Sequence, residues 1–303
     1  MSFRFLLVLL ALMGSHAYSE TYPDDLWLHA KPELEGVNPK KIKKYLNSLN
    51  RFSTTCSVIV KNGKIIGNYR GHKEGRIFSI GKTIQSMAIG VAIDEDLLSL
   101  ESAGPVGTVR EHLQQNYTGQ WDYEPIKGQL NAQEILDDYT GDAEQYVKDR
   151  IFKRLKMKHT KPDPILGNSF QTSSCLDIAR LGLLLARGGK WQDQQLVPES
   201  YWSEAIGPVS DNAAYGFLLW LNNDGEWSAG SELKKRSETK PIPGAPDDLI
   251  MANGVGGQII FAIPSLDLVI VRIGWDHRTE TMYRVWETWD AVEGIVESAK
   301  EGQ

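Results

Sequence analysis

Just after its first quarter the chain reads Phe78-Ser79-Ile80-Gly81-Lys82-Thr83. Apolar residues then recur at three- and four-residue spacing from Ile84 to Ile93, which predicts a buried helix that begins near Ser79. Residues three apart share one helix face, so the Lys82 amine can reach the Ser79 hydroxyl and, when neutral, accept its proton. Backbone N–H groups at a helix start also favour negative charge on a reacting oxygen. The stretch therefore predicts half of an acyl-transfer site.

A structural interpretation of the same residues is also open. Ser-x-x-Lys is a short pattern, and serine is a favoured residue at helix N-caps. In that interpretation Ser79 only caps the helix and Lys82 is a surface lysine. The remainder of the chain has to decide between the two.

Composition limits the classes of function. The 303 residues are 41% apolar and 24% charged, which suits a large globular domain. The net charge is −6 and the chain has no basic cluster, so we expect no nucleic-acid partner. The six histidines show no metal-ligand spacing, and we expect neither a metal site nor a cofactor.

The first 17 residues have the pattern of a secretory signal peptide. Arg4 precedes an apolar run, and small residues lead up to Ala17, after which we predict cleavage. Residues 18–303 then form a single domain, and no later segment is long enough to span a bilayer. We expect an exported protein, periplasmic or secreted; an uncleaved membrane anchor is the alternative. The sequence does not indicate an oligomeric state.

Two cysteines, Cys56 and Cys175, lie far apart in the chain. Export would permit a disulfide, but a lone pair in a domain of this size is more often two buried thiols. Two thiols are therefore the commoner case, and the sequence leaves open whether Cys56 and Cys175 pair.

The two ends of the chain supply the predicted strands. Asn62-Gly63 lies between β-branched runs at 57–61 and 64–69 and predicts a hairpin, because both turn residues need positive φ. Four further strands are predicted late in the chain, at 215–221, 250–253, 258–263 and 266–272. The short connections between the last three force antiparallel pairing.

Helical patterns fill most of the remaining chain. They cover 39–49, 108–113, a stretch ending at 138, 143–155, 176–187, 198–206 and 280–300. Strands from both chain ends with a helical middle indicate an α+β protein, in which helices flank an antiparallel sheet. A helical lobe at about 97–210 is inserted between the sheet segments.

Several short motifs, taken in their order along the chain, resemble those of the serine hydrolases of the β-lactamase and penicillin-binding-protein-like family. The resemblance covers about residues 55–275 and is strongest to the class C-like branch of esterases, D-aminopeptidases and 6-aminohexanoate-oligomer hydrolases. It rests on Phe78-Ser79-Ile80-Gly81-Lys82, Tyr123 before Thr140-Gly141, Asp177-Ile178-Ala179-Arg180-Leu181-Gly182, Tyr215-Gly216-Phe217, and Gly254-Val255-Gly256-Gly257-Gln258. It implies a β-lactamase/transpeptidase-like fold.

The resemblance also implies roles for individual residues. Ser79 would attack the carbonyl of an ester or amide and form an acyl-enzyme, with Lys82 and Tyr123 as acid and base. The backbone N–H groups of Ser79 and Gln258 would form the oxyanion hole. The residues bordering the substrate would be Val255, Gly256 and Gly257.

Three departures from the family pattern bear on this function. Pro125 stands where Asn or Ser is usual, and Val255 stands where Lys or His would hold a substrate carboxylate. Only 44 positions separate Ser79 from Tyr123, so the helical lobe is shortened. We therefore expect neutral esters and amides to be preferred over carboxylate-bearing β-lactams. The alternative is a catalytically impaired protein that acts as a binding or structural module.

Asp276 and His277 are the best candidates for a rival histidine-based triad. The chain contains no Gly-x-Ser-x-Gly elbow to supply the nucleophile of such a triad. The rival chemistry is accordingly the weaker prediction.

Overall fold

The computed structural model describes residues 20–105, 107–115, 132–163, 167–208, 212–228, 239–275 and 281–303. The predicted signal peptide, residues 1–17, lies outside the described residues. Across the described ranges, no helix is both long enough and apolar enough to cross a lipid bilayer.

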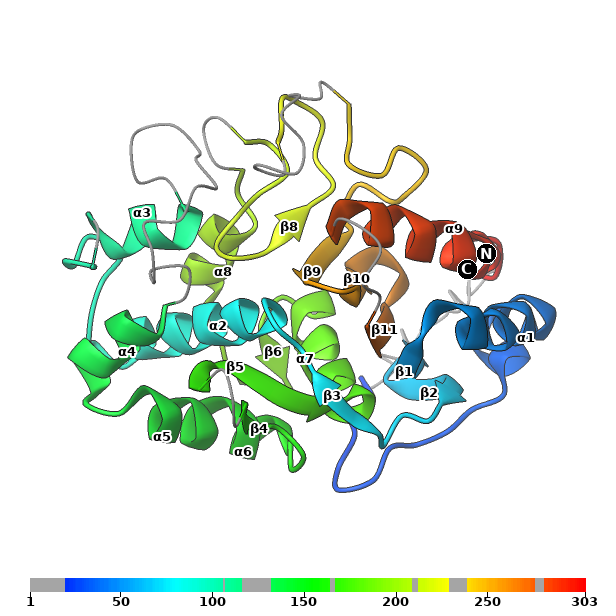
Figure 1. Ribbon diagram of the computed structural model, residues 1–303, viewed down its shortest axis with the longest axis horizontal. Coiled ribbons are helices and arrows are strands. Elements are labelled where there is room, and N and C mark those ends of the chain that lie inside the picture. The colour runs from blue at the N-terminus through cyan, green and yellow to red at the C-terminus, as the bar shows by residue number, and fades with distance from the viewer. Residues whose placement is uncertain are drawn as a thin grey trace, which may run out of the picture.

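An antiparallel sheet with the strand order β2-β1-β11-β10-β9-β8 forms the centre of the molecule (Figure 1). Its strands are β1 Thr54–Lys61, β2 Lys64–Tyr69, β8 Trp220–Leu221, β9 Ile250–Gly254, β10 Gln258–Ile263 and β11 Leu268–Gly274. The two ends of the chain meet where β1 pairs with β11, with Val58 opposite Val271. The predicted antiparallel pairing and the α+β class are confirmed.

The β1–β2 hairpin turns at Asn62 and Gly63, whose φ values are 51° and 73°. Asn-Gly adopts this conformation at low cost, which is why the dipeptide predicts the turn. A Cβ atom at Gly63 would lie 1.8 Å from the carbonyl oxygen of Thr21, so the close approach of the N-terminal segment also requires glycine here.

Helices cover both faces of the sheet (Figure 1). On one face lie α1, Pro39–Ser48, and α9, Thr281–Glu301; on the other lie α2, Ile80–Asp94, and α7, Cys175–Ala186. Because strand side chains alternate, Ile260 packs toward α2 and α7 whereas Phe261 packs toward α9, with its ring 5.5 Å from Trp289. Covering both faces explains why β10 and β11 are apolar without alternation.

Smaller elements fill the chain between β2 and β8. The helices are α3 Val109–Gln114, α4 Gln133–Thr140, α5 Ala143–Val147, α6 Lys153–Leu155 and α8 Glu199–Ala205, with a π-helical turn at Lys148–Phe152. One small sheet has the order β3-β5-β4, formed by β3 Glu74–Arg76, β4 Lys161–Asp163 and β5 Gly167–Ser174; another pairs β6 Lys190–Trp191 with β7 Gln194–Gln195. None of these five short strands was predicted, because they are polar and lack alternation.

The predicted strand at 215–221 is wrong except at Trp220–Leu221. Leu218 has a φ of 56°, which interrupts an extended chain. Its carbonyl oxygen accepts from the Thr83 hydroxyl at 2.9 Å, and its N–H donates to Leu113 at 3.0 Å. Bonds to α2 and α3 therefore take the place of a strand ladder.

The commoner case of two thiols does not hold here. Cys56 and Cys175 form a disulfide with a Cα–Cα distance of 5.9 Å, and both residues are fully buried. The bond joins β1 to the first residue of α7 across 119 positions of sequence. A disulfide that closes so long a loop typically stabilises a fold by about 2–4 kcal/mol.

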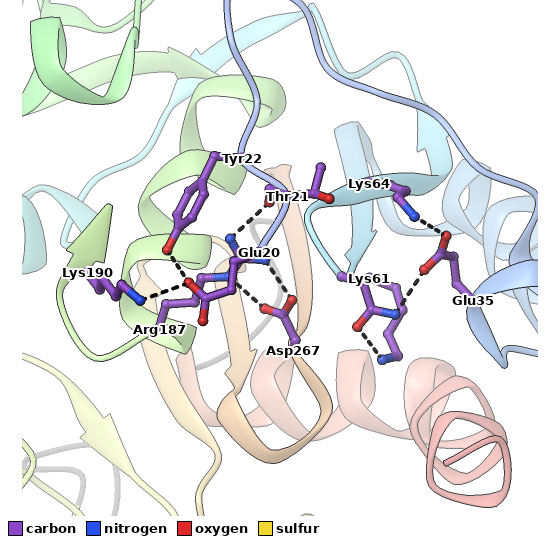
Figure 2. Close-up of polar contacts among 10 residues, drawn as sticks. Glu20, Thr21, Tyr22, Glu35, Lys61, Lys64, Arg187, Lys190 and Asp267 are labelled. Carbon is purple, nitrogen blue, oxygen red and sulfur yellow. Dashed lines mark hydrogen bonds and ion pairs between the residues drawn. The ribbon is translucent and has the colours of Figure 1, made fainter. Parts of the chain in front are cut away.

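Residues 20–38, here called the N-terminal strap, are bound to the surface by two arginines. Arg187 donates to the Thr21 carbonyl oxygen at 2.9 Å and pairs with Asp267, as Figure 2 shows. Arg180 donates to the Asp24 carbonyl oxygen at 2.6 Å. The strap then hydrogen-bonds Ile65 and so covers the outer edge of β2, which is otherwise open to pairing.

Candidate active site

The candidate nucleophile, Ser79, occupies the N-cap position of α2 and is half-buried. Its backbone has nearly helical angles, with φ −66° and ψ −7°, and its side chain makes no capping hydrogen bond to the first turn. A serine that serves as a cap normally makes that bond. The hydroxyl is thus not committed to the helix, and the cap interpretation lacks its main interaction.

Lys82 lies one helical turn further along, where its N–H donates to the Ser79 carbonyl oxygen at 3.1 Å. The residue is only 7% exposed, and its amine has no hydrogen-bond or ion-pair partner among the residues that the structure describes. Burial lowers the pKa of Lys82 to about 8. Lys82 is therefore not a surface lysine, and part of its population is neutral and able to accept a proton near neutral pH.

Residues 77–79, which end at Ser79, are called the nucleophile segment. Other parts of the chain contact this segment from two sides. Ile77 donates to the Gln171 carbonyl oxygen at 3.0 Å. Gly254 lies so close that a Cβ atom there would come within 2.5 Å of the Ile77 carbonyl oxygen. Phe78 has a φ of 47°, a conformation that costs a bulky residue roughly 1–2 kcal/mol. Strain of this kind persists where packing fixes the backbone, and it concentrates at functional sites.

The turn between β9 and β10, residues 255–257, lies beside this segment. Gly256 and Gly257 have φ values of 82° and 90°, which side chains other than glycine rarely allow. The N–H of Gly257 donates to the Gly254 carbonyl oxygen at 3.2 Å and closes the turn. Val255 is 45% exposed at its tip. The predicted substrate-binding residues thus lie next to the nucleophile segment, and the contact with that segment is made by Gly254.

Gln258, the predicted second residue of the oxyanion hole, begins β10 and is buried. Its side-chain Nε2 donates to the Val255 carbonyl oxygen at 2.9 Å, and its Oε1 accepts from the Gly274 N–H at 2.8 Å. The side chain therefore ties the turn to the end of β11.

Arg272 supports the same turn and was not predicted. It is 2% exposed on β11, and its guanidinium donates to the Gly257 carbonyl oxygen and, at 3.0 Å, to the Thr54 hydroxyl. Arginine is almost never fully buried unless it is paired. A lone arginine within the apolar run 268–273 was therefore a signal that could have found it.

The remaining predicted residues, Tyr123 and the rival pair Asp276 and His277, lie outside the described residues. In the part of the chain that is described, no three His, Cys, Asp or Glu side chains gather where they could hold a metal ion. The described residues bring together a serine, a buried lysine and a glycine turn. This set can support nucleophilic attack, proton transfer and oxyanion stabilisation.

No protein-family model and no curated protein matches the chain. Solved structures do: a β-lactamase from Mycobacterium bovis matches with a TM-score of 0.62 at 17% identity, covering 83% of this chain and 99% of that chain. A D-stereospecific amidohydrolase from Streptomyces sp. matches with a TM-score of 0.58 at 14% identity, over 82% and 98% of the two chains.

A third similar structure is an octameric penicillin-binding protein homologue from Pyrococcus abyssi. Its TM-score is 0.56 at 14% identity, over 84% of this chain and 77% of that chain. At these identities the likeness shows the fold. The β-lactamase/transpeptidase-like fold implied by the motifs is confirmed.

Proposed function

We propose that this protein is a serine hydrolase that cleaves a neutral carboxylic ester or amide through an acyl-enzyme on Ser79. The observation that carries the proposal is the buried Lys82, which has no partner among the described residues and lies one turn after a serine whose hydroxyl does not cap its helix. A lysine with a purely structural role would be exposed or paired, because burying an unpaired charge is costly. The fold shared with a β-lactamase and a D-stereospecific amidohydrolase supports this reaction class.

In the proposed reaction Lys82 accepts the Ser79 proton while Oγ forms a bond to the carbonyl carbon. The N–H groups of Ser79 and Gln258 would stabilise the resulting oxyanion. Cleavage of the bond to the alcohol or amine releases that group with the proton. Water then attacks the acyl-enzyme, assisted by the same base, and frees Ser79. No cofactor takes part in this scheme.

Tyr123 is assigned the transfer of the proton between Lys82 and the leaving group, as the resemblance implies. Tyr123→Phe should lower kcat on an amide by about 10²-fold or more, because general acid–base groups contribute on that order. Tyr117→Phe is the matched control, since Tyr117 is the nearest other tyrosine in sequence. Turnover is measured by steady-state kinetics. If Tyr123→Phe and Tyr117→Phe both turn over the amide as fast as wild type does, Tyr123 has no part in the mechanism.

We also propose that the protein is exported and acts in the periplasm or outside the cell. The signal-like residues 1–17 motivate this proposal. The buried bond between Cys56 and Cys175 supports it, because disulfides form and persist in oxidising compartments.

The decisive experiment is labelling with a fluorophosphonate, followed by mass spectrometry of the modified peptide. We expect the adduct on Ser79, and we expect Ser79→Ala to abolish both the adduct and ester hydrolysis while unfolding stability stays within about 1 kcal/mol of wild type.

Ser174→Ala is the matched control for this experiment. Ser174 is the N-cap of α7, and its side chain accepts from the Asp177 N–H. This substitution should lower stability by about 1 kcal/mol and leave labelling intact. A wild-type protein that neither labels nor hydrolyses esters would favour the alternative, a binding module without turnover.

A further inference from the structure

A pocket of about 290 Å³ lies beside the nucleophile segment, at the end of the central sheet where β1 begins and β11 ends. Its lining includes the aromatic side chains of Phe78 and Trp275, together with Ile273 and Thr55. Phe78 is bonded directly to Ser79, so their Cα atoms are about 3.8 Å apart. We call this space the aromatic pocket. It is large enough for a substituted ring, since benzene occupies a cavity of about 150 Å³.

Trp275 connects the two halves of the candidate active site. Its ring lies 5.1 Å from the ring of Phe78, with 32° between the ring planes. On another side it lies against Gly256, where a Cβ atom would come within 2.4 Å of the indole. Trp275 is nevertheless 39% exposed. An exposed indole fixed between the nucleophile segment and the glycine turn offers a rigid surface for stacking.

The polar groups of the pocket favour an uncharged occupant. Arg76 pairs with Asp163 at 2.7 Å, and the Asp163 side chain is 1% exposed, so the charge of the arginine is balanced within the protein. The Gln258 carboxamide is engaged with Val255 and Gly274. Among the described residues that line the pocket, the only cation is the paired Arg76, so a carboxylate would gain little there, whereas an apolar ring would find aromatic and aliphatic walls.

The geometry points to the aromatic pocket as the binding site for an uncharged aromatic ring carried by the substrate, held so that its ester or amide group meets Ser79. The catalytic meaning of this site rests on the proposed function. The binding itself does not, because it requires no turnover. Trp275 then determines specificity, and small aliphatic substrates bind more weakly than substrates that carry a ring.

The test uses the full chain carrying Ser79→Ala, which can hold an amide without cleaving it. Phenylacetamide is the probe with a ring and acetamide the matched probe without one, with affinities measured by calorimetry. We expect phenylacetamide to bind at least tenfold more tightly, and a second substitution, Trp275→Ala, to remove this preference. Trp202→Ala, at a partly buried tryptophan on α8 outside the pocket, should leave the preference unchanged.

Equal affinity for the two amides, or a preference that survives Trp275→Ala, would overturn the inference. If Trp275→Ala does not fold, Trp275→Phe identifies the indole N–H signal of Trp275 in NMR spectra of the Ser79→Ala protein. That signal should shift as phenylacetamide is added, and a signal that stays in place overturns the inference. Failure of the proposed function is a separate result: wild-type protein without turnover or a Ser79 adduct, whatever the outcome of the binding measurement.

Discussion

Lys82 and Arg187 are both cations with little exposure to solvent, but their surroundings differ. Arg187 donates to both carboxylate oxygens of Asp267, at 3.1 and 2.7 Å, and to the Thr21 carbonyl oxygen, while the Tyr22 ring lies 4.2 Å from its guanidinium carbon (Figure 2). Lys82 has no such partner among the described residues. One region uses a buried cation to attach the N-terminal strap, whereas in the other the described residues offer the cation no partner.

The pKa values of Arg187 and Lys82 shift in opposite directions. Burial acts to lower the pKa of each group, but at Arg187 the hydrogen bond and negative charge of Asp267 outweigh it, and the pKa is raised. At Lys82 burial is the cause of the shift, with no compensating carboxylate among the residues that the structure describes, and the pKa falls to about 8. At Arg187, a cation that holds the N-terminal strap, Asp267 therefore compensates for burial. An uncompensated amine beside a serine is the pattern expected of a base.

The largest effect that tests this contrast is expected for Lys82→Met. Loss of the base should lower kcat/KM for an ester by about 10²- to 10⁴-fold. The free energy of unfolding at pH 7 should rise by up to about 3 kcal/mol, since the wild-type amine is mostly charged and buried at that pH and one pKa unit corresponds to about 1.4 kcal/mol. Kinetics and urea denaturation measure the two changes.

Lys61→Met is the matched control for this variant. Lys61 is also buried with a lowered pKa, but its amine donates to the Asn62 side chain at 2.8 Å. We expect its loss to leave turnover unchanged. A Lys82→Met protein that is less stable than wild type and equally active would make Lys82 a structural residue.

Arg187→Met should lose stability and keep activity, the reverse of what is expected for Lys82→Met. It removes the partner of Asp267 and one anchor of the N-terminal strap, so we expect a loss of about 3 kcal/mol in the free energy of unfolding. Turnover per folded molecule should be unchanged. Arg150→Met is the control, because the side chains of Arg150 and Glu95 are 39% and 32% exposed and a solvent-accessible pair should contribute under about 1 kcal/mol. Equal losses in the two variants would contradict the special role of Arg187.

The smallest effect concerns pH. With Lys82 as base, kcat/KM should rise about tenfold from pH 7 to a plateau above about pH 8, as the buried amine loses its proton. Unfolding stability should also rise between about pH 8 and 10.5, because over that range the unfolded chain holds more protons on Lys82 than the folded chain does. Lys82→Met should lack this rise in denaturation curves recorded across the range. A flat rate profile would exclude Lys82 as the base.

Much of the fold could be predicted because its signals are local. Asn62-Gly63 dictates a tight turn, and the spacing of apolar residues dictates α2. The apolar runs of β10 and β11 are joined by a short connection, and a connection of that length allows only antiparallel pairing. The positions of Ser79 and Lys82 on one helix face follow from the same local periodicity.

Features that depend on distant segments could not be predicted. The polar strand β3 exists because β5, about a hundred positions later, pairs with it. Residues 215–219 leave the extended conformation because α2 and α3 bond to Leu218. Cys56 and Cys175 become partners because the sheet and α7 pack together, which their spacing in sequence does not show.

The candidate site also combines features that follow from local sequence with features that depend on distant segments. The sequence by itself determined which side chains are available: a serine and a lysine one helical turn apart, and a glycine-rich turn between two strands. Only the tertiary structure decided that Lys82 is buried with no partner in the described part of the chain, that Arg272 and Gln258 hold the turn, and that Trp275 lies between Phe78 and Gly256. The physical reason is that burial, and the pKa shifts and pockets that follow from it, depend on which distant segments pack together, whereas periodicity and turn chemistry depend on near neighbours.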